Sequence, residues 1–151
     1  MLRVMSEASE DFDTPVLPGD ASSDYERYLN TLELLELQKP PDERAHRDEL
    51  LFQVVHQSSE LWLKLATSDV EEAARLAEEG DVAEAARMLR RPLRCMRFVT
   101  SQLDMLEELS PWEYQEIRKV LGHGSGFDSP GWRIRQCWHH SSSSISDSAS
   151  R

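Results

Sequence analysis

The stretch from Asp48 to Lys64 constrains the fold more than any other part of the chain. Its apolar residues, at positions 50, 51, 52, 54, 55, 61, 62 and 63 and again at 65, surround a helix on almost all sides. A helix that is apolar all round is expected to be buried all round. One series interrupts this pattern, because Phe52, His56, Glu60 and Lys64 recur every four residues on one face. His56 is therefore either a satisfied core histidine or a functional group, and this stretch alone favours the core interpretation.

The composition excludes several classes of protein. A length of 151 residues suggests one domain with a modest core, and the net charge of −11 argues against nucleic acid or an anionic membrane as the main partner. No apolar run approaches the roughly 20 residues of a spanning helix, and the N-terminus does not resemble a secretory signal. Cys95 and Cys137 form no CxxC pair. They fit a reducing, cytoplasmic location and no cysteine metal site.

Helical spacing and helix-end signals predict an all-α fold. A first helix is expected from residues 22–24 to Gln38, before Pro40. A second is expected from residues 42–48 to Glu79, ended by Gly80. A third runs from residue 81 to 109 with a kink or break at Pro92. A fourth covers residues 111–121 behind a Ser-Pro-x-Glu start, and a fifth begins at residues 129–130.

The sequence predicts one helical domain between two disordered ends. Residues 1–22 read as an acidic disordered arm, residues 23–138 as an incomplete helical domain, and residues 139–151 as a Ser-rich disordered tail. The adjacent His139 and His140 point to different faces of a helix, which disfavours a metal site. The Gly-rich segment 122–126, just ahead of a helix start, allows positive φ or a close backbone approach.

Two surface features leave alternatives open. Tyr25 and Tyr28 are either core residues or, because both carry hydroxyl groups that need partners, part of an interface or pocket wall. A basic cluster is either a solvated face paired with the acidic helix or an anion contact; its members are Arg87, Arg90, Arg91, Arg94 and Arg97.

Three sequence blocks occur in a specific order. The first is Tyr25-x-x-Tyr28-Leu29 with Gln38. The second runs from Asp48-Glu49-Leu-Leu-Phe52 through His56-Gln57-x-x-Glu60-Leu61-Trp62-x-Lys64. The third runs from Leu106-Glu-x-x-x-Pro111 through Arg118-x-x-Leu121 to Ser125-Gly126-Phe127-x-Ser129-x-x-Trp132-Arg133. Together they resemble the tryptophan 2,3-dioxygenase family of haem-dependent aromatic oxygenases. The resemblance covers about residues 25–133.

The resemblance implies the N-terminal portion of a helical bundle that binds haem b and forms a homotetramer. It implies that His56 lies beside the indole N–H of L-tryptophan as the catalytic residue, that Arg133 binds the substrate carboxylate, and that Phe52 walls the pocket. Tyr25 and Tyr28 are implied to close it from a partner subunit. The family reaction inserts both atoms of O2 across the indole C2–C3 bond and gives N-formylkynurenine.

Several positions depart from the family pattern. Leu32 stands where Asp is usual, Asp128 replaces a Gln, and residues 122–124 and 130–131 also differ. A related indole is therefore a second substrate candidate. The axial haem histidine of the family is expected downstream, so no metal ligand is assigned within this chain.

Two other functions are compatible with the sequence. The chain could be a non-catalytic helical remnant that acts only in oligomerisation or partner binding. A four-helix di-metal protein using His56 and Glu60 is the weaker alternative, because such a fold needs further carboxylate and histidine pairs on other helices.

Overall fold

The computed structural model describes residues 14–132, and all the regular secondary structure in this range is helical. The predicted all-α class is therefore confirmed. The chain divides between Pro40 and Pro41 into two compact units, 1–40 and 41–151. Between residues 14 and 132, none of the helices combines the length and the apolar character needed to cross a bilayer. The predicted domain boundaries at residues 22 and 138 stay predictions.

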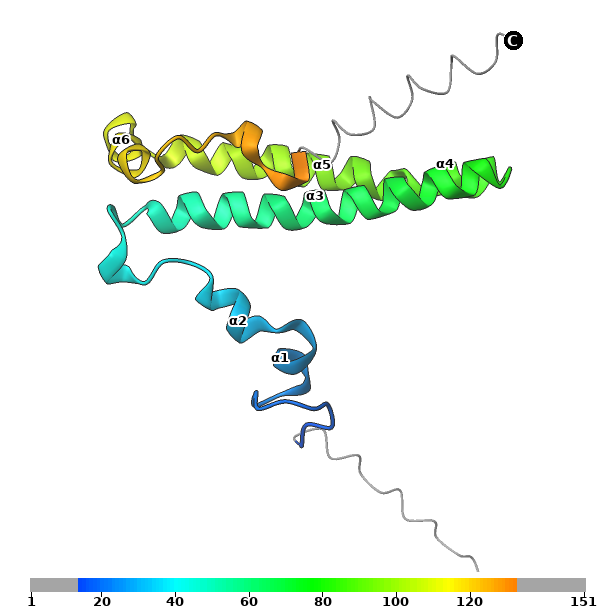
Figure 1. Cartoon of the computed structure of the whole chain (residues 1–151), viewed down its shortest axis with the longest axis horizontal. Coiled ribbons are helices and arrows are strands. Elements are labelled where there is room, and N and C mark those ends of the chain that lie inside the picture. The colour runs from blue at the N-terminus through cyan, green and yellow to red at the C-terminus, as the bar shows by residue number, and fades with distance from the viewer. Residues whose placement is uncertain (1–13, 133–151) are drawn as a thin grey trace, which may run out of the picture. The chain divides into compact units, whose positions relative to one another are not determined.

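Two short helices form the first unit (Figure 1): α1, Asp24–Leu29, and α2, Thr31–Glu36. The prediction of one continuous helix to Gln38 is wrong, because Asn30 adopts a φ of 50° between them. Asparagine tolerates this left-handed conformation better than most residues do, and a right-handed helix cannot continue through it.

The segment before α1 contacts this helix through hydrogen bonds. The Asp24 carboxylate accepts the N–H groups of Val16 at 2.9 Å and Leu17 at 2.7 Å. These bonds hold the pKa of the Asp24 carboxyl below its usual range. Arg27 donates to the carbonyl oxygens of Ala21, at 2.8 Å, and Leu17. This part of the expected acidic arm is therefore fastened to α1.

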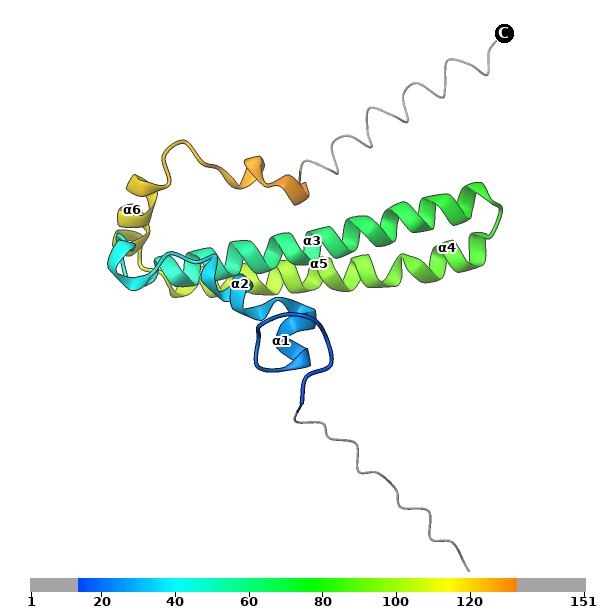
Figure 2. The same ribbon diagram turned by 60° about the horizontal axis from the view of Figure 1, so that its bottom comes forward.

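The second unit is built on one long helix. It begins with a short 3₁₀ helix, η1 (Pro41–Glu43), followed by α3 (Glu49–Glu78). The chain then turns at Gly80, whose φ is 89°, as expected for a residue that ends a helix. The next helices, α4 (Val82–Met88) and α5 (Arg90–Leu103), return antiparallel to α3 (Figures 1 and 2).

The predicted third helix is interrupted between α4 and α5. The junction is Leu89, with φ −68° and ψ −7°, three residues before Pro92. Pro92 thus lies in the first turn of α5, where a missing N–H costs no intrahelical hydrogen bond. The expected break is confirmed, and it falls one turn earlier than the proline itself.

Small and branched side chains fill the contact between α3 and the returning helices. The buried apolar residues of this contact are Val55, Leu63, Ala66, Ala73, Ala85 and Cys95. The expectation that α3 is buried on every side is wrong, since Val54, Leu61 and Leu65 are 46%, 51% and 38% exposed. The returning helices cover one side of α3, and the described part of the second unit, residues 41–132, leaves much of the other side open.

Polar contacts fix the register of α3 against α5. The hydroxyls of Ser58 and Ser59 both donate to Gln102 Oε1, at 3.1 and 3.2 Å. Further along α3, toward its C-terminus, the buried carboxylate of Asp69 accepts hydrogen bonds from two N–H groups of Arg91, one of them at 2.9 Å. For Arg91, the predicted pairing of the basic cluster with the acidic helix is confirmed.

Helix α6 lies near the start of α3, and the segment that ends at residue 132 reaches Glu60 further along this helix (Figures 1 and 2). The chain continues from α5 into a 3₁₀ helix, η2 (Asp104–Glu108), and then α6 (Pro111–Val120). After Gly122, with φ 63°, comes η3 (Gly126–Asp128), and residues 130–132 begin a further helix. The predicted helix starts after Ser110 and Ser129 are both present.

Reciprocal hydrogen bonds cap the start of α6. Ser110 Oγ accepts the N–H of Glu113 at 3.3 Å, and the Glu113 carboxylate accepts the N–H of Ser110 at 2.7 Å. Pro111 occupies the first helical position, where it needs no donor. This capping box was predicted from the sequence, and it is confirmed.

Replacing Ser110 with alanine is expected to lower the free energy of unfolding by about 1 kcal/mol, because the helix loses its capping acceptor. Urea unfolding followed by circular dichroism measures the change. The matched control is Ser110→Asp, which keeps an acceptor oxygen and should stay close to wild type. A Ser110→Ala protein as stable as wild type would show that the cap contributes nothing.

Candidate functional site

A cleft of about 470 Å³ lies between the start of α3 and the α6 region of the second unit. This volume falls within the roughly 300–1,000 Å³ typical of small-molecule sites. Its lining combines aromatic, aliphatic, cationic and backbone groups: Phe52, His56, Leu106, Tyr114, Arg118, Leu121, Gly124, Ser125 and Gly126. Such a lining suits an aromatic ligand that also carries a negative charge.

Helix α3 contributes an aromatic pair to the cleft. Phe52 and His56 lie one turn apart on the same face, and their ring centroids are 4.1 Å apart. The His56 ring nitrogen Nδ1 lies 2.7 Å from the carbonyl oxygen of Phe52. Because a carbonyl oxygen only accepts, Nδ1 carries the proton in this contact. In the neutral imidazole Nε2 then keeps its lone pair and can accept a hydrogen bond from a ligand.

Helix α6 contributes the opposite wall. Tyr114 and Arg118 are four residues apart and therefore share a face, and the Tyr114 ring centroid lies 6.4 Å from that of Phe52. Ile117, only 1% exposed, anchors the helix between them. Arg118 Nη1 donates to the carbonyl oxygen of Gly122 at 2.6 Å. This bond holds the guanidinium at the end of α6 beside the cleft, and the group has further N–H donors.

A tightly bonded loop closes one side of the cleft. Gly124 N–H donates to Leu121 O at 3.2 Å, and a Cβ on Gly124 would lie only 3.1 Å from that oxygen. Ser125 Oγ accepts the N–H of Phe127 at 3.3 Å, and the Asp128 carboxylate accepts the N–H of Ser125 at 3.1 Å. The loop is therefore shaped by its own hydrogen bonds, and both glycine properties expected of the Gly-rich segment occur in it.

The structure brings together only part of the predicted site. Phe52 and His56 line the same cleft. Tyr25 and Tyr28 lie in the first unit and are 68% and 77% exposed, which favours the interface or pocket-wall interpretation over a core position. Arg133 lies outside the described residues, and its role stays a prediction.

Seven of the nine residues that line the cleft were not predicted as site residues, among them Tyr114 and Arg118. Tyr114 and Arg118 both lie on α6, and Arg118 belongs to one of the sequence blocks that carried the family resemblance. Their spacing of four, on a helix that buries Ile117, was a usable signal. The spacing indicates that Tyr114 and Arg118 share a helix face, but it does not indicate that this face lines the cleft.

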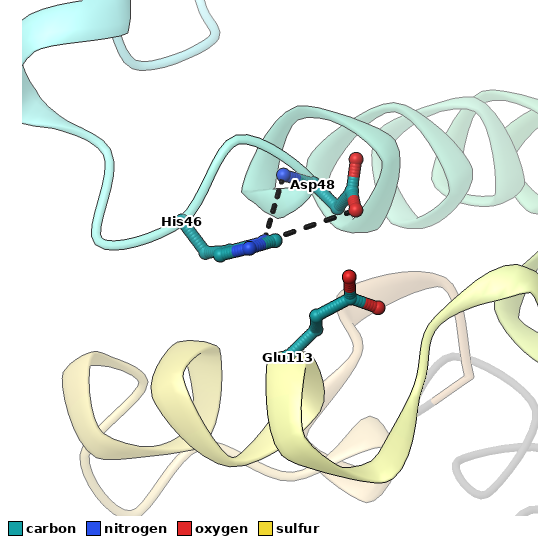
Figure 3. A group of neighbouring side chains, drawn as sticks. All are labelled: His46, Asp48 and Glu113. Atoms are coloured by element: carbon teal, nitrogen blue, oxygen red, sulfur yellow. Dashed lines mark hydrogen bonds and ion pairs between the residues drawn. The ribbon is translucent and has the colours of Figure 1, made fainter.

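A second group of side chains joins the starts of α3 and α6. Figure 3 shows His46, Asp48 and Glu113, whose possible ligand atoms all lie within 4.8 Å of one another. These groups are already engaged: Asp48 N–H donates to His46 Nδ1 at 3.2 Å, Arg47 Nε lies 3.4 Å from Asp48 Oδ1, and Ser110 binds Glu113. The partial positive charge of two helix N-termini also favours carboxylates here without a cation. We interpret the group as a contact that fastens α6 to α3.

Glu113 makes this contact dependent on pH. Hydrogen bonds from Ser110 hold the pKa of the Glu113 carboxyl below its ordinary 4.5, and the charges of His46 and Arg47 lower it further. A carboxyl with a lowered folded-state pKa stabilises the fold above its unfolded-state pKa, and this contribution disappears as the pH falls through the lowered value. We expect Glu113→Gln to lower the urea midpoint at neutral pH and the difference from wild type to shrink below pH 4.5. A difference that is constant across this range would contradict the expectation.

Comparison with known proteins decides the family. A family model described as tryptophan 2,3-dioxygenase matches residues 10–137 of the chain. The chain belongs to this family. A tryptophan 2,3-dioxygenase of Xanthomonas oryzae pv. oryzae (strain PXO99A) is 41% identical over 109 residues, which are 72% of this chain and 37% of the relative. The tryptophan 2,3-dioxygenase of Rhodococcus jostii (strain RHA1) is 39% identical over 109 residues, 72% of this chain and 38% of the relative.

Membership of the tryptophan 2,3-dioxygenase family also confirms the fold class. The helical hairpin of α3 to α5, with α6 beside its open end, is the N-terminal portion of a bundle of this type. The chain spans little more than one third of the length of the relatives that it matches. The activity of a whole tryptophan 2,3-dioxygenase is therefore a matter of proposal for this chain.

Proposed function

We propose that the cleft is the substrate site of a haem-dependent dioxygenase and binds L-tryptophan or a related indole amino acid. The reaction inserts both atoms of O2 across the indole C2–C3 bond, which breaks, and gives N-formylkynurenine. One observation carries the proposal: a hydrogen-bond acceptor, His56 Nε2, and a cation, Arg118, line the same cleft beside the Phe52 ring. These three groups match the three chemical parts of such a substrate.

Each group of the cleft has a distinct task in this proposal. The neutral His56 accepts the indole N–H at Nε2 and so orients the ring. Phe52 and Tyr114 provide an aromatic slot for the indole. The planar guanidinium of Arg118 binds the carboxylate through two parallel N–H groups. Arg118 thus takes the role that the resemblance suggested for Arg133.

The cleft fits the substrate side of a haem pocket. Within residues 14–132 its lining offers one imidazole, and a His56 that accepts the indole N–H cannot also coordinate iron. The axial ligand of haem b is therefore expected from another part of the protein. When bound, haem supplies the O2 chemistry, while this chain binds the substrate, orients it and excludes water. Closure by Tyr25 and Tyr28 of a partner subunit in a homotetramer remains part of the proposal.

An absorption spectrum of the protein with added haem b, recorded with and without L-tryptophan, tests the proposal. With imidazole added in place of the axial ligand that this chain is not expected to supply, we expect a haem band that differs from that of free haem in the same buffer and shifts on addition of L-tryptophan. We also expect N-formylkynurenine by mass spectrometry once a reductant and O2 are present. In His56→Ala the tryptophan-dependent shift should be lost. A spectrum identical to that of free haem under both conditions would contradict dioxygenase function for this chain.

Exposed apolar side chains on the hairpin favour a second candidate function. Leu61 is 51% exposed on α3, and Leu93 and Phe98 are 64% and 50% exposed on α5. Where such residues form one contiguous patch, they mark a surface that another chain covers. In this second proposal the chain acts only in oligomerisation or partner binding. Sedimentation that shows a monomer at all concentrations would contradict self-association.

A further inference from the structure

The helix that follows the cleft loop is attached to α3 by one carboxylate. Glu60 Oε2 accepts the N–H of Gly131 at 2.8 Å, across 71 positions of sequence. Glu60 lies one turn after His56 on α3, so the residue that orients the proposed substrate and the residue that holds this helix share a face. The half-buried Glu60 is not among the residues that line the cleft. Its contribution to the site therefore acts through the segment that it holds.

Gly131 is the residue that allows this contact. It is buried, and a Cβ at this position would lie 2.6 Å from Leu63 Cβ and 2.8 Å from Glu60 Oε2. Leu63 is itself only 5% exposed and cannot move aside without disturbing the α3–α5 contact. Any side chain at position 131 would push the start of the helix away from α3. This position is one of those at which the sequence departs from the family pattern.

The backbone N–H groups of Gly131 and Trp132 each have a side-chain acceptor. Pro130 has no N–H to satisfy, and the N–H of Trp132 donates to Ser129 Oγ at 3.0 Å. Glu60 therefore satisfies the N–H of Gly131, one of the donors that the start of a helix leaves without an intrahelical partner. Loss of the carboxylate leaves that donor in a buried position without its partner.

The anchored helix start and the cleft wall belong to the same short segment. Ser125 and Gly126 line the cleft, and Gly131 follows five residues later. The Gly124 bond to Leu121 holds the segment at its beginning, and the Glu60 bond holds it at its end. With only one end held, the Ser125–Gly126 wall would no longer keep a fixed distance from His56.

We propose that Glu60 is a positioning residue, whose hydrogen bond to Gly131 holds the 125–131 segment against α3 and so fixes the cleft wall opposite the indole. This inference rests on the proposed function of the cleft. It concerns the geometry of the segment, which can be measured without any ligand.

Two variants, one without and one with an acceptor oxygen at position 60, test the hydrogen bond between Glu60 and Gly131. Glu60→Ala removes the acceptor, whereas Glu60→Gln removes the charge and keeps a carbonyl oxygen as acceptor. NMR hydrogen exchange of the Gly131 amide is expected to be faster by about tenfold or more in Glu60→Ala and close to wild type in Glu60→Gln. Glu71→Ala, a matched change at an exposed position of the same helix, should leave it unchanged. Equal exchange in Glu60→Ala and wild type would overturn the proposal.

Calorimetric titration with L-tryptophan tests whether the contact positions the cleft. We expect affinity to fall several-fold in Glu60→Ala and in Gly131→Ala, and Glu60→Gln to restore it. Faster exchange with unchanged affinity would overturn the positioning role and leave only a structural contact. If wild type itself does not bind L-tryptophan, the proposed function fails and the positioning role fails with it, while the exchange data still report the contact separately.

Discussion

Replacing Arg118 with leucine is expected to weaken L-tryptophan binding by about 100-fold and to leave tryptamine binding nearly unchanged. Tryptamine keeps the indole and the amine but lacks the carboxylate. A charge-assisted hydrogen bond between a guanidinium and a carboxylate contributes about 1.5–3 kcal/mol, and a bidentate pair lies at the upper end of that range. Isothermal titration calorimetry with both ligands measures the two affinities. The difference between them isolates the carboxylate contact from the fit of the indole ring.

Two further arginine variants serve as controls for this experiment. Arg47→Leu removes a charge whose side chain is 91% exposed and which lies outside the cleft lining, so both affinities should stay at the wild-type values. Arg133→Leu distinguishes the two arginines of the family-like segment. If it reproduces the loss expected of Arg118→Leu, and Arg118→Leu does not, the carboxylate partner is Arg133 and the role proposed for Arg118 is contradicted.

Truncating Ile117 to alanine is expected to cost about 2–5 kcal/mol of unfolding free energy, the range for a buried isoleucine. Ile117 is 1% exposed and sits between the two cleft residues of α6. Small domains are stable by only about 5–15 kcal/mol, so a large share of the stability of this chain is at stake. Urea unfolding at neutral pH measures the loss. Ligand binding should weaken in parallel, because α6 would no longer be held in place.

The conservative change at the same position is the control. Ile117→Val removes one methylene group and should cost about 0.5–1.5 kcal/mol while L-tryptophan binding persists. Equal stability of Ile117→Ala and wild type would mean that α6 is not packed as the structure describes. The cleft would then lack a fixed wall, and the proposed site would lose its basis.

Local sequence signals were sufficient for much of the fold. The Ser110–Glu113 capping box, the left-handed Gly80 and the break before Pro92 each depend on a few neighbouring residues, and all three occur. The shared face of Phe52 and His56 also follows from helical spacing alone. These features are predictable because the interactions that determine them are made within one turn or one cap.

Features that depend on distant residues were not predictable in the same way. Arg118 lines the cleft, where the carbonyl oxygen of Gly122, a residue with positive φ after α6, holds its guanidinium. The Glu60 contact joins residues 71 apart and requires the glycine at position 131. Asn30 ends α1 even though the apolar spacing continues past it. A right-handed helix cannot continue through a residue in the left-handed conformation, whatever the spacing of the apolar side chains.

An NMR titration of the protein with L-tryptophan tests the central claim most directly. The amide signals of Arg118, Ser125 and Gly126 report on the cleft, and that of Gly80, at the far turn of the hairpin, reports on the rest of the fold. We predict saturable shifts for the three cleft residues and none for Gly80. Cleft signals that do not move, or that move no more than Gly80, would contradict the assignment of this cleft as the site for an indole amino acid.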